Sequence, residues 1–518
     1  MKRIVQTQPR YWTILLTTVL CLVFSACNDS DDGNKEETGD TADTSTTDTN
    51  ATDSASDVQT DTGDTDSETE TDAGAPALRP VVFVHGGVGS ADQFESQAQR
   101  FACNGYPADY ISGYEYDSPN NMNPNEVLDK EIDAHIDAVL AHTGATQVDL
   151  LGHSLGTAHS QHYLKSSPER AAKVAHYVNI DGYPAEELPG GVPTLALWAG
   201  MSTYKTDETT GEQEKVPDEE LGEIVGATNL RFSGMSHVEA ATSFKTFPEM
   251  YKFFNDGKEP ATTDILPETS EKITLAGRAS SFAYNKTLEG YALAIYEVAG
   301  ETGARLSDTP VYTADITGKG EFSFSDGVAG KYYEFYLYDS KGTNTITRHF
   351  YYEPFIRTDL MIRLKASDPT VPGSLSSKLP RSPNHCNIVI SRQMEFIGDA
   401  DNPAYAGEEG LANDSLTING TEICTPELSP ASNRTNGIFI TDWNADGVTD
   451  LSQWIEDLSS TPFLMGADLF LQAADPSTGV IGVVVKSRDN PAKERKLNIP
   501  NWPSPTHQST VQFCDFVQ

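Results

Sequence analysis

The sequence predicts a mostly parallel β-sheet covered by helices on both faces, followed by a region built from β-strands alone. Apolar runs at 81–84 and 148–151 each stop at a glycine-containing turn, and an amphipathic helical pattern at 125–142 lies between them. After residue 272, short strand-like runs alternate with Gly or Asp turns. A chain of 518 residues is long enough for about three domains.

The first 27 residues have the order of charges and apolar residues that is typical of a secretory signal. Lys2, Arg3 and Arg10 precede an apolar run at 11–24, which is short for a membrane span. The run ends in Phe24-Ser25-Ala26-Cys27, which resembles the lipobox of bacterial lipoproteins, although Phe24 replaces the usual Leu. We expect residues 1–27 to be a lipoprotein signal peptide with acylation at Cys27. An ordinary signal peptide with an incidental cysteine is the alternative.

Residues 28–75 have the composition of a disordered tether. They hold 12 Asp and 4 Glu against one Lys and have almost no apolar residues, so they cannot bury enough surface to offset their ordering entropy. The whole chain has a formal charge of −40, which argues against a nucleic-acid binder. We therefore expect an exported protein, anchored to a membrane through its lipid and facing the periplasm or the cell exterior.

The motif that carries chemistry is Gly152-His153-Ser154-Leu155-Gly156, directly after the apolar run at 148–151. In a strand-to-helix turn of this kind, the flanking glycines leave room for a serine whose hydroxyl stands exposed above the sheet. A second helix is predicted from 154 to about 166. Ser154 is therefore the candidate nucleophile of a catalytic domain at 76–262.

A serine hydroxyl needs an imidazole to take its proton and a carboxylate to orient that imidazole. His237 is the one histidine between a late acid and residue 262, and it follows the short strand at 229–232. For the acid we favour Asp181, which ends the apolar strand at 177–180. Asp207, Glu208 and Asp218, in a polar loop, are the competitors.

The oxyanion that forms on an attacked carbonyl requires backbone N–H groups set at hydrogen-bond distance. Leu155 follows the nucleophile, and Gly87 follows His85-Gly86 at the end of the first strand. These two residues are the candidate donors of the oxyanion hole.

Three segments closely resemble the carboxylesterase/lipase family known from the archaeon Archaeoglobus: 85–97, beginning His85-Gly86-Gly87; 167–176, beginning Ser167-Pro168-Glu169; and 258–265. The resemblance extends over nearly everything after the tether. It implies an α/β hydrolase followed by C-terminal all-β domains, the triad Ser154, Asp181 and His237, and an oxyanion hole at Gly87 and Leu155. The family carries a long lid after the strand ending near Asp117, whereas only residues 118–125 stand there in this chain, which puts interfacial activation and long-chain preference in doubt.

A Thr- and Pro-bearing linker at 260–271 leads into the C-terminal half. We expect a β-sandwich-like domain at 263–366 and a mostly β domain at 367–518. Aromatic residues at 332–333 and 350–352 suit either a strand core or contact with an acyl chain or polymer. Because export permits disulfides, we expect one bridge among Cys103, Cys386, Cys424 and Cys514.

The segment 442–450 has the spacing of a calcium loop. Asp442, Asn444, Asp446 and Asp450 alternate around Gly447, but position twelve is Gln453 rather than the usual Glu. A structural Ca²⁺ site and an Asx-rich turn both remain open, and we expect no cofactor to be required for catalysis.

Together these features predict an exported serine ester hydrolase of the esterase/lipase type, with an acyl-ester or lipid substrate. One alternative is a hydrolase of extracellular polyesters or polysaccharide esters whose β domains bind the polymer. The other is a non-enzymatic surface binding protein. The sequence does not indicate the oligomeric state.

Overall fold

The computed structural model describes residues 78–200, 204–206, 213–216, 221–367, 374–399, 413–429, 435–459 and 461–514. The described residues from Leu78 onward belong to one compact unit. Within them, no helix combines the length and apolar character needed to cross a membrane. The expected signal peptide, Cys27 and the tether lie outside the described residues.

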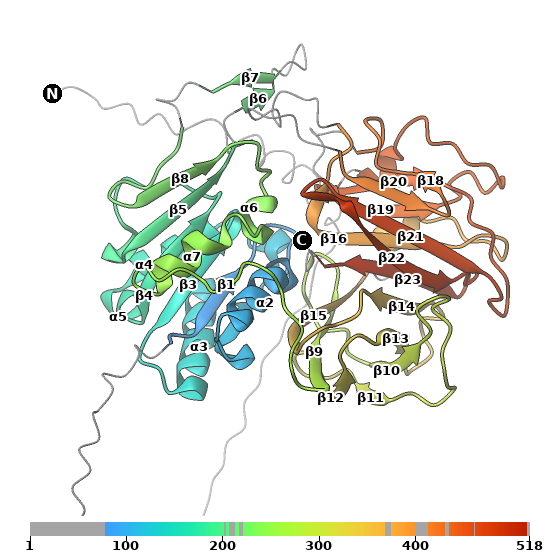
Figure 1. Ribbon diagram of the computed structural model, residues 1–518, viewed down its shortest axis with the longest axis horizontal. Helices are drawn as coiled ribbons and strands as arrows, with labels where there is room; N and C mark the ends of the chain where they lie inside the picture. Colours follow the sequence, from blue (N-terminus) through green and yellow to red (C-terminus); the bar gives the residue numbers. More distant parts are fainter. Residues whose placement is uncertain are drawn as a thin grey trace, which may run out of the picture. The chain divides into compact units, whose positions relative to one another are not determined.

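The N-terminal part of this unit is built on a six-stranded sheet in the order β2-β1-β3-β4-β5-β8, in which every neighbouring pair is parallel. Figure 1 shows these strands in blue to green. Their bounds are β1 Val81–Val84, β2 Ile111–Tyr114, β3 Val148–His153, β4 Val174–Ile180, β5 Thr194–Ala199 and β8 Thr228–Phe232. A small hairpin, β6 Tyr204–Thr206 and β7 Gln213–Lys215, lies between β5 and β8 in the chain.

Helices cover both faces of the sheet because alternate residues of a strand point to opposite faces. Val81 and Phe83 pack in one core cluster with residues of α2, α6 and α7, whereas Val82 and Val84 pack in another with residues of α3, α4 and α5. The helices are α2 Glu95–Cys103, α3 Glu126–Thr143, α4 Leu155–Ser166, α5 Pro168–Ala172, α6 Glu239–Thr242 and α7 Phe247–Phe254. The predicted α/β-hydrolase architecture is therefore confirmed.

The helix predicted at 125–142 shows how local sequence sets its ends. The Asn125 side chain accepts hydrogen bonds from the backbone N–H groups of Val127 and Leu128 and so caps the N-terminus of α3. Gly144 ends the helix with a φ of 72°, a conformation that costs glycine little. Between β2 and α3 the chain forms a short 3-10 helix at Ser118–Asn120.

The C-terminal half consists of β-sheets, as predicted, drawn yellow to red in Figure 1. Three sheets have the orders β12-β9-β15, β18-β17-β21-β22 and β11-β10-β13-β14-β23-β16-β19-β20. The strands up to residue 366 are β9 Lys272–Ser281, β10 Tyr291–Val298, β11 Tyr312–Asp315, β12 Glu321–Val328, β13 Tyr332–Asp339, β14 Thr347–Tyr352 and β15 Asp359–Ala366. The later strands are β16 Ile388–Phe396, β17 Ser415–Ile418, β18 Thr421–Glu422, β19 Thr435–Thr441, β20 Leu464–Asp468, β21 Val480–Ser487, β22 Asn490–Pro500 and β23 His507–Phe513, with short helices α8 Leu375–Lys378 and α9 Glu456–Ser459.

The eight-stranded sheet joins strands from before and after residue 366. Its central link is the parallel pairing of β14 with β23, in which Thr347 is opposite His507. The C-terminal strand thus returns to the middle of the sheet and lies between β14 and β16.

Parallel pairing brings the carboxyl ends of β3, β4 and β8 to one edge of the catalytic sheet. Ser154 follows β3, Asp181 follows β4, and His237 lies in the loop after β8. Residues at this edge of an open α/β sheet form its ligand-binding sites.

Candidate active site

Ser154 stands in a tight turn between β3 and α4. Its backbone has a φ of 52° and a ψ of −122°, in a region that a residue with a Cβ rarely adopts. A Cβ on Gly156 would lie 2.2 Å from the carbonyl oxygen of Val84, and one on Gly152 would lie 2.8 Å from the carbonyl oxygen of Gly156. The two glycines of the motif are therefore required by close backbone approach, as the sequence suggested.

Asp181 leaves the end of β4 with a φ of 40° and is almost fully buried. Its Oδ1 accepts a hydrogen bond of 2.8 Å from the backbone N–H of Ala199, the last residue of β5. A Cβ on the following Gly182 would collide with Thr157 of α4 at 2.0 Å. The carboxylate is thus fixed by the neighbouring strand.

His237 meets Asp181 at hydrogen-bond distance. Nδ1 of His237 lies 2.5 Å from Oδ2 of Asp181, and both side chains are more than nine-tenths buried. With Nδ1 turned to the carboxylate, Nε2 is the ring nitrogen that remains for a second partner. Ser154 and His237 line the same pocket. The competitors Asp207, Glu208 and Asp218 lie outside the described residues.

His153, the residue before Ser154, contacts the loop that carries His237. Its Nε2 lies 3.0 Å from the carbonyl oxygen of His237, and its Nδ1 lies 2.7 Å from Nε2 of Gln93. Burial, with a smaller contribution from His237, lowers the pKa of His153 to about 3, so the ring is neutral. A neutral ring can donate from Nε2 and accept at Nδ1, which is what these two contacts require.

Gly87 and Leu155 are the candidate oxyanion donors; Gly87 lines the same pocket as Ser154, and Leu155 follows Ser154 in the chain. A Cβ on Gly87 would lie 3.7 Å from Cδ2 of Leu155, so the two residues are adjacent, and Leu155 begins helix α4. Within the described part of the chain, neither N–H donates to a protein acceptor. Two unused donors, one of them at the positive end of a helix, suit a developing oxyanion.

The loop that carries Gly87 is held by groups from both halves of the chain. Gln93 Oε1 accepts a 3.3 Å hydrogen bond from the N–H of Gly86. Asn285, in the turn after β9, donates from Nδ2 to the carbonyl oxygens of Gly89 at 2.9 Å and Tyr116 at 3.0 Å. The β-sheet region therefore helps to shape the proposed oxyanion hole.

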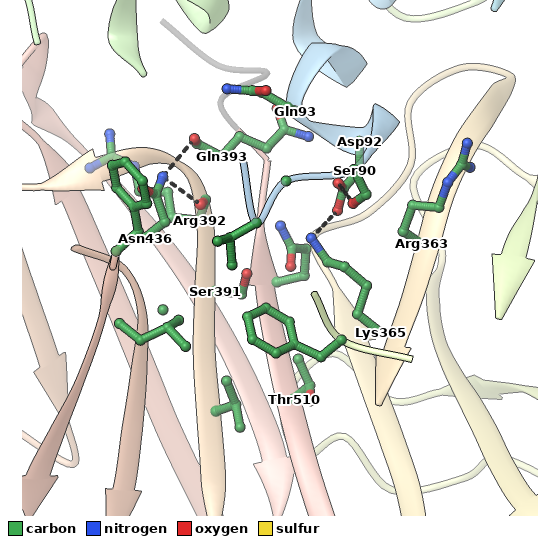
Figure 2. Close-up of a pocket in the computed structure, with 18 of the residues that line it drawn as sticks. Ser90, Asp92, Gln93, Arg363, Lys365, Ser391, Arg392, Gln393, Asn436 and Thr510 are labelled. Carbon is green, nitrogen blue, oxygen red and sulfur yellow. Dashed lines mark hydrogen bonds and ion pairs between the residues drawn. The ribbon is translucent and has the colours of Figure 1, made fainter. Parts of the chain in front are cut away.

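The pocket above Ser154 is walled on one side by the catalytic domain and on the other by the β-sheets. Its cavity volume is about 160 Å³, and it opens to solvent. Apolar side chains from the β-sheets form much of its wall; they include Phe282, Phe350, Val389, Phe439, Phe463 and Leu464. Figure 2 shows polar residues of both halves around the same space, among them Ser90 and Asp92 opposite Ser391 and Thr510.

The Phe463 side chain lies next to the catalytic loop. Its ring is stacked on that of His237 with centroids 6.4 Å apart. Its φ of 67° is unusual for a bulky residue, and two backbone amides, of Asn436 and Gly437, hold its carbonyl oxygen at 2.8 and 3.1 Å. Strain of this kind persists where the surroundings enforce it and is common at ligand sites.

Three cations of the pocket are paired with carboxylates. Lys365 lies 2.7 Å from Asp92 (Figure 2), Arg363 lies 2.6 Å from Glu115, and Arg392 lies 2.9 Å from Asp414. The charge of Arg363 contributes to lowering the pKa of buried Glu115 to about 2, against the opposing effect of burial. Each of these three cations therefore has a carboxylate partner inside the protein.

The predicted calcium loop uses its carboxylates within the loop. Asp442 accepts from the N–H groups of Asp446 and Gly447, Asp450 accepts from that of Ser452, and the amide of Asn444 donates to Asp468. Among the residues that the structure describes, no group of three or more His, Cys, Asp or Glu side chains is arranged to hold a metal ion. This geometry is that of an Asx-rich turn, and calcium binding stays a prediction.

The expected disulfide does not form. Cys103, Cys386, Cys424 and Cys514, all described, are free thiols. Their sulfurs contact other polar groups: Cys514 Sγ lies 3.4 Å from a carboxylate oxygen of Glu95, and Cys386 Sγ lies 3.8 Å from the carbonyl oxygen of Gln472. Burial raises the pKa of the Cys386 thiol to about 12.

Comparisons with known proteins agree with this architecture. Residues 78–170 match the family model Lipase (class 2), residues 271–369 match Lipase C-terminal domain, and residues 374–517 match a model of a further C-terminal domain.

Similar solved structures include two lipases. Lipase B of Aspergillus fumigatus is 13% identical over 36% of this chain and 54% of its own, with a TM-score of 0.27. The lipase BlEst2 of Bacillus licheniformis is 16% identical over 35% of this chain and 93% of its own, with a TM-score of 0.27. The two lipase family models support the conclusion that the chain is a lipase- or esterase-type hydrolase that acts on esters.

Proposed function

We propose that the protein is an exported serine carboxylesterase or lipase that cleaves acyl esters through an acyl-enzyme intermediate. The observation that supports this most strongly is the 2.5 Å contact of buried Asp181 with His237, which lines the same pocket as Ser154. A carboxylate that holds an imidazole beside a strained serine is the arrangement needed to activate a hydroxyl.

In the first half-reaction, Nε2 of His237 takes the proton of the Ser154 hydroxyl as Oγ attacks the ester carbon. The Asp181 carboxylate stabilises the imidazolium, and the N–H groups of Gly87 and Leu155 stabilise the oxyanion. The carbon–oxygen bond to the leaving group then breaks, and His237 returns its proton to the departing alkoxide. A water molecule repeats these steps on the acyl-enzyme and regenerates Ser154.

The pocket supports an acyl substrate. Much of its wall on the β side is apolar and can contact an acyl chain. The resemblance to the archaeal carboxylesterase/lipase family favours the same substrate class. Of the aromatic residues considered for acyl or polymer contact, Tyr333, Tyr351 and Tyr352 are buried in the cores, whereas Phe350 lines the pocket.

We propose export and acylation at Cys27 from the sequence, with residues 28–75 as the tether to the membrane. Metabolic labelling with a fatty acid probes this, because Cys27→Ala should lose the lipid. A probe that labels both forms equally would contradict anchoring at Cys27.

The activity is tested with p-nitrophenyl esters of increasing acyl length. We expect hydrolysis that rises from acetate to medium-chain esters, and a loss of roughly 10⁶-fold in kcat in Ser154→Ala. Hydrolysis retained in folded Ser154→Ala would contradict the mechanism. Binding of the esters without any turnover by the unmodified protein would favour the non-enzymatic alternative.

A further inference from the structure

The loop that carries His237 begins helix α6 with a capping box. In Ser236-His237-Val238-Glu239, the N–H of Glu239 donates to Ser236 Oγ at 3.3 Å, and the N–H of Ser236 donates to Oε2 of Glu239 at 3.3 Å. Such reciprocal bonds fix the entry into a short helix. His237 is thus held inside a local structure that its own neighbours specify.

Glu395 of β16, in the β-sheet region, accepts hydrogen bonds from the loop that carries His237. Its Oε1 accepts from the N–H of Val238 at 2.8 Å, and its Oε2 accepts from the hydroxyl of Ser236 at 2.5 Å and the N–H of Glu239 at 3.2 Å. These three donors lie immediately before and after His237. Glu395 is fully buried, so no water competes for its oxygens.

Arg488 binds both Glu395 and Glu239 and so supports the contact between β16 and the His237 loop. One guanidinium nitrogen donates to the backbone carbonyl of Glu395 at 2.8 Å, and the other donates to Glu239 at 2.7 Å. Asp414 binds the guanidinium at 2.6 Å, and it also binds Arg392 at 2.9 Å. The two guanidinium groups thus offset the charges of Glu239 and Asp414, whereas the Glu395 carboxylate is held by the neutral donors of the His237 loop.

We propose that Glu395 is a positioning residue for His237, so that the β-sheet region completes the catalytic site. This inference rests on the proposed function. Asp181 holds the ring of His237, and His153 holds its carbonyl group. Glu395 holds the Ser236 hydroxyl before His237 and the N–H groups of Val238 and Glu239 after it. Glu395 touches no reacting atom; it acts by fixing where the imidazole meets the Ser154 hydroxyl.

The proposal predicts an effect on the chemical step rather than on binding. A displacement of about 1 Å in a catalytic group can cost about 100-fold in rate. In Glu395→Gln, an NH₂ group replaces one oxygen and cannot accept from the loop. We expect kcat to fall about 10- to 100-fold with KM unchanged, and labelling of Ser154 by a fluorophosphonate to slow by the same factor.

A matched control separates positioning from stability. Glu353 is also a buried glutamate of the β-sheet region, where it accepts from Arg495 and from the N–H of Cys514. Glu353→Gln should lower Tm about as much as Glu395→Gln does but leave kcat unchanged. Equal losses of kcat in the two variants, or a wild-type kcat in Glu395→Gln, would overturn the proposal.

The measurement is made on the full chain. It distinguishes failure of the proposed function from failure of the positioning role. An unmodified protein that neither turns over esters nor reacts with the fluorophosphonate would refute the proposed function. An active unmodified protein with an unaffected Glu395→Gln would refute the positioning role alone. If Glu395→Gln does not fold, Ser236→Ala decides, because it removes one of the three donors: about a five-fold fall in kcat is expected, and an unchanged kcat would overturn the role.

Discussion

The two walls of the pocket differ in how they make a catalytic site. The catalytic domain supplies Ser154, Asp181 and His237 from the ends of neighbouring parallel strands, close to motifs that are visible in the chain. The β-sheet region supplies Asn285 and Glu395, whose side chains hold the oxyanion loop and the His237 loop. The first wall thus carries the proposed reacting groups, whereas side chains of the second wall hold the loops on which two of them depend.

Asp181→Asn tests the catalytic wall and has the largest expected effect. The amide cannot stabilise an imidazolium, and it favours the wrong tautomer of His237, so we expect kcat to fall about 10⁴-fold. Steady-state ester hydrolysis measures this, with circular dichroism to verify folding. A loss smaller than that of Asp207→Asn would show that the acid has been misassigned.

Asn285→Gly tests the opposite wall at the oxyanion loop. Glycine accepts the φ of 54° at this position, so the change removes the side-chain amide that contacts Gly89, Tyr116 and His85 without straining the backbone. We expect kcat to fall about 10-fold, since the Gly87 amide is less well placed.

Asn419→Gly is the matched control for Asn285→Gly. Asn419 has a φ of 49°, but it lies in an exposed turn outside the pocket. The kcat of Asn419→Gly should equal that of the unmodified protein. Equal activities for the two variants would contradict a role for Asn285 in the site.

Glu95 of α2 lies where the catalytic domain contacts the β-sheet region, beside Gln393 of β16. Glu95→Gln has the smallest expected effect, which is on Tm rather than on kcat. Burial, followed by the charge of Asp359 and a hydrogen bond to it, raises the pKa of Glu95 well above its usual value. The folded state therefore holds this proton more tightly than the unfolded state, so the free energy of unfolding falls as pH rises above about 4.5. We expect the Tm of Glu95→Gln, relative to the unmodified protein, to rise by about 2 °C or more between pH 5 and pH 9.

Glu334 is a buried carboxylate whose pKa is shifted in the opposite direction to that of Glu95. Burial raises the pKa of Glu334, but hydrogen bonds from His349 and Arg305 outweigh it and lower the pKa overall. This carboxylate stabilises the folded state above its unfolded pKa, so its loss in Glu334→Gln should lower Tm at pH 7. A Tm difference between Glu95→Gln and the unmodified protein that does not change with pH would contradict a raised pKa of Glu95.

The catalytic wall could be predicted because its signals are local. A strand, a glycine and a serine follow one another at 148–156, and each glycine is explained by a backbone atom within 3 Å of its missing Cβ. The Ser236-x-x-Glu239 capping box was also present in the sequence and could have been recognised.

The β wall could not be predicted in the same way. Glu395 lies 157 positions from Val238, and nothing in its own segment indicates that its carboxylate turns toward the other domain. The disulfide prediction was wrong because cysteine count and compartment do not say where a thiol points. Cys514, for example, meets a carboxylate.

The central claim is that Ser154 is an activated nucleophile, and covalent labelling of the intact folded protein tests it most directly. A fluorophosphonate should attach to one residue, identified by mass spectrometry of the digested protein as Ser154, and ester hydrolysis should fall in proportion to the label. Folded protein that takes no label, or Ser154→Ala that labels as fast as the unmodified chain, would contradict the account.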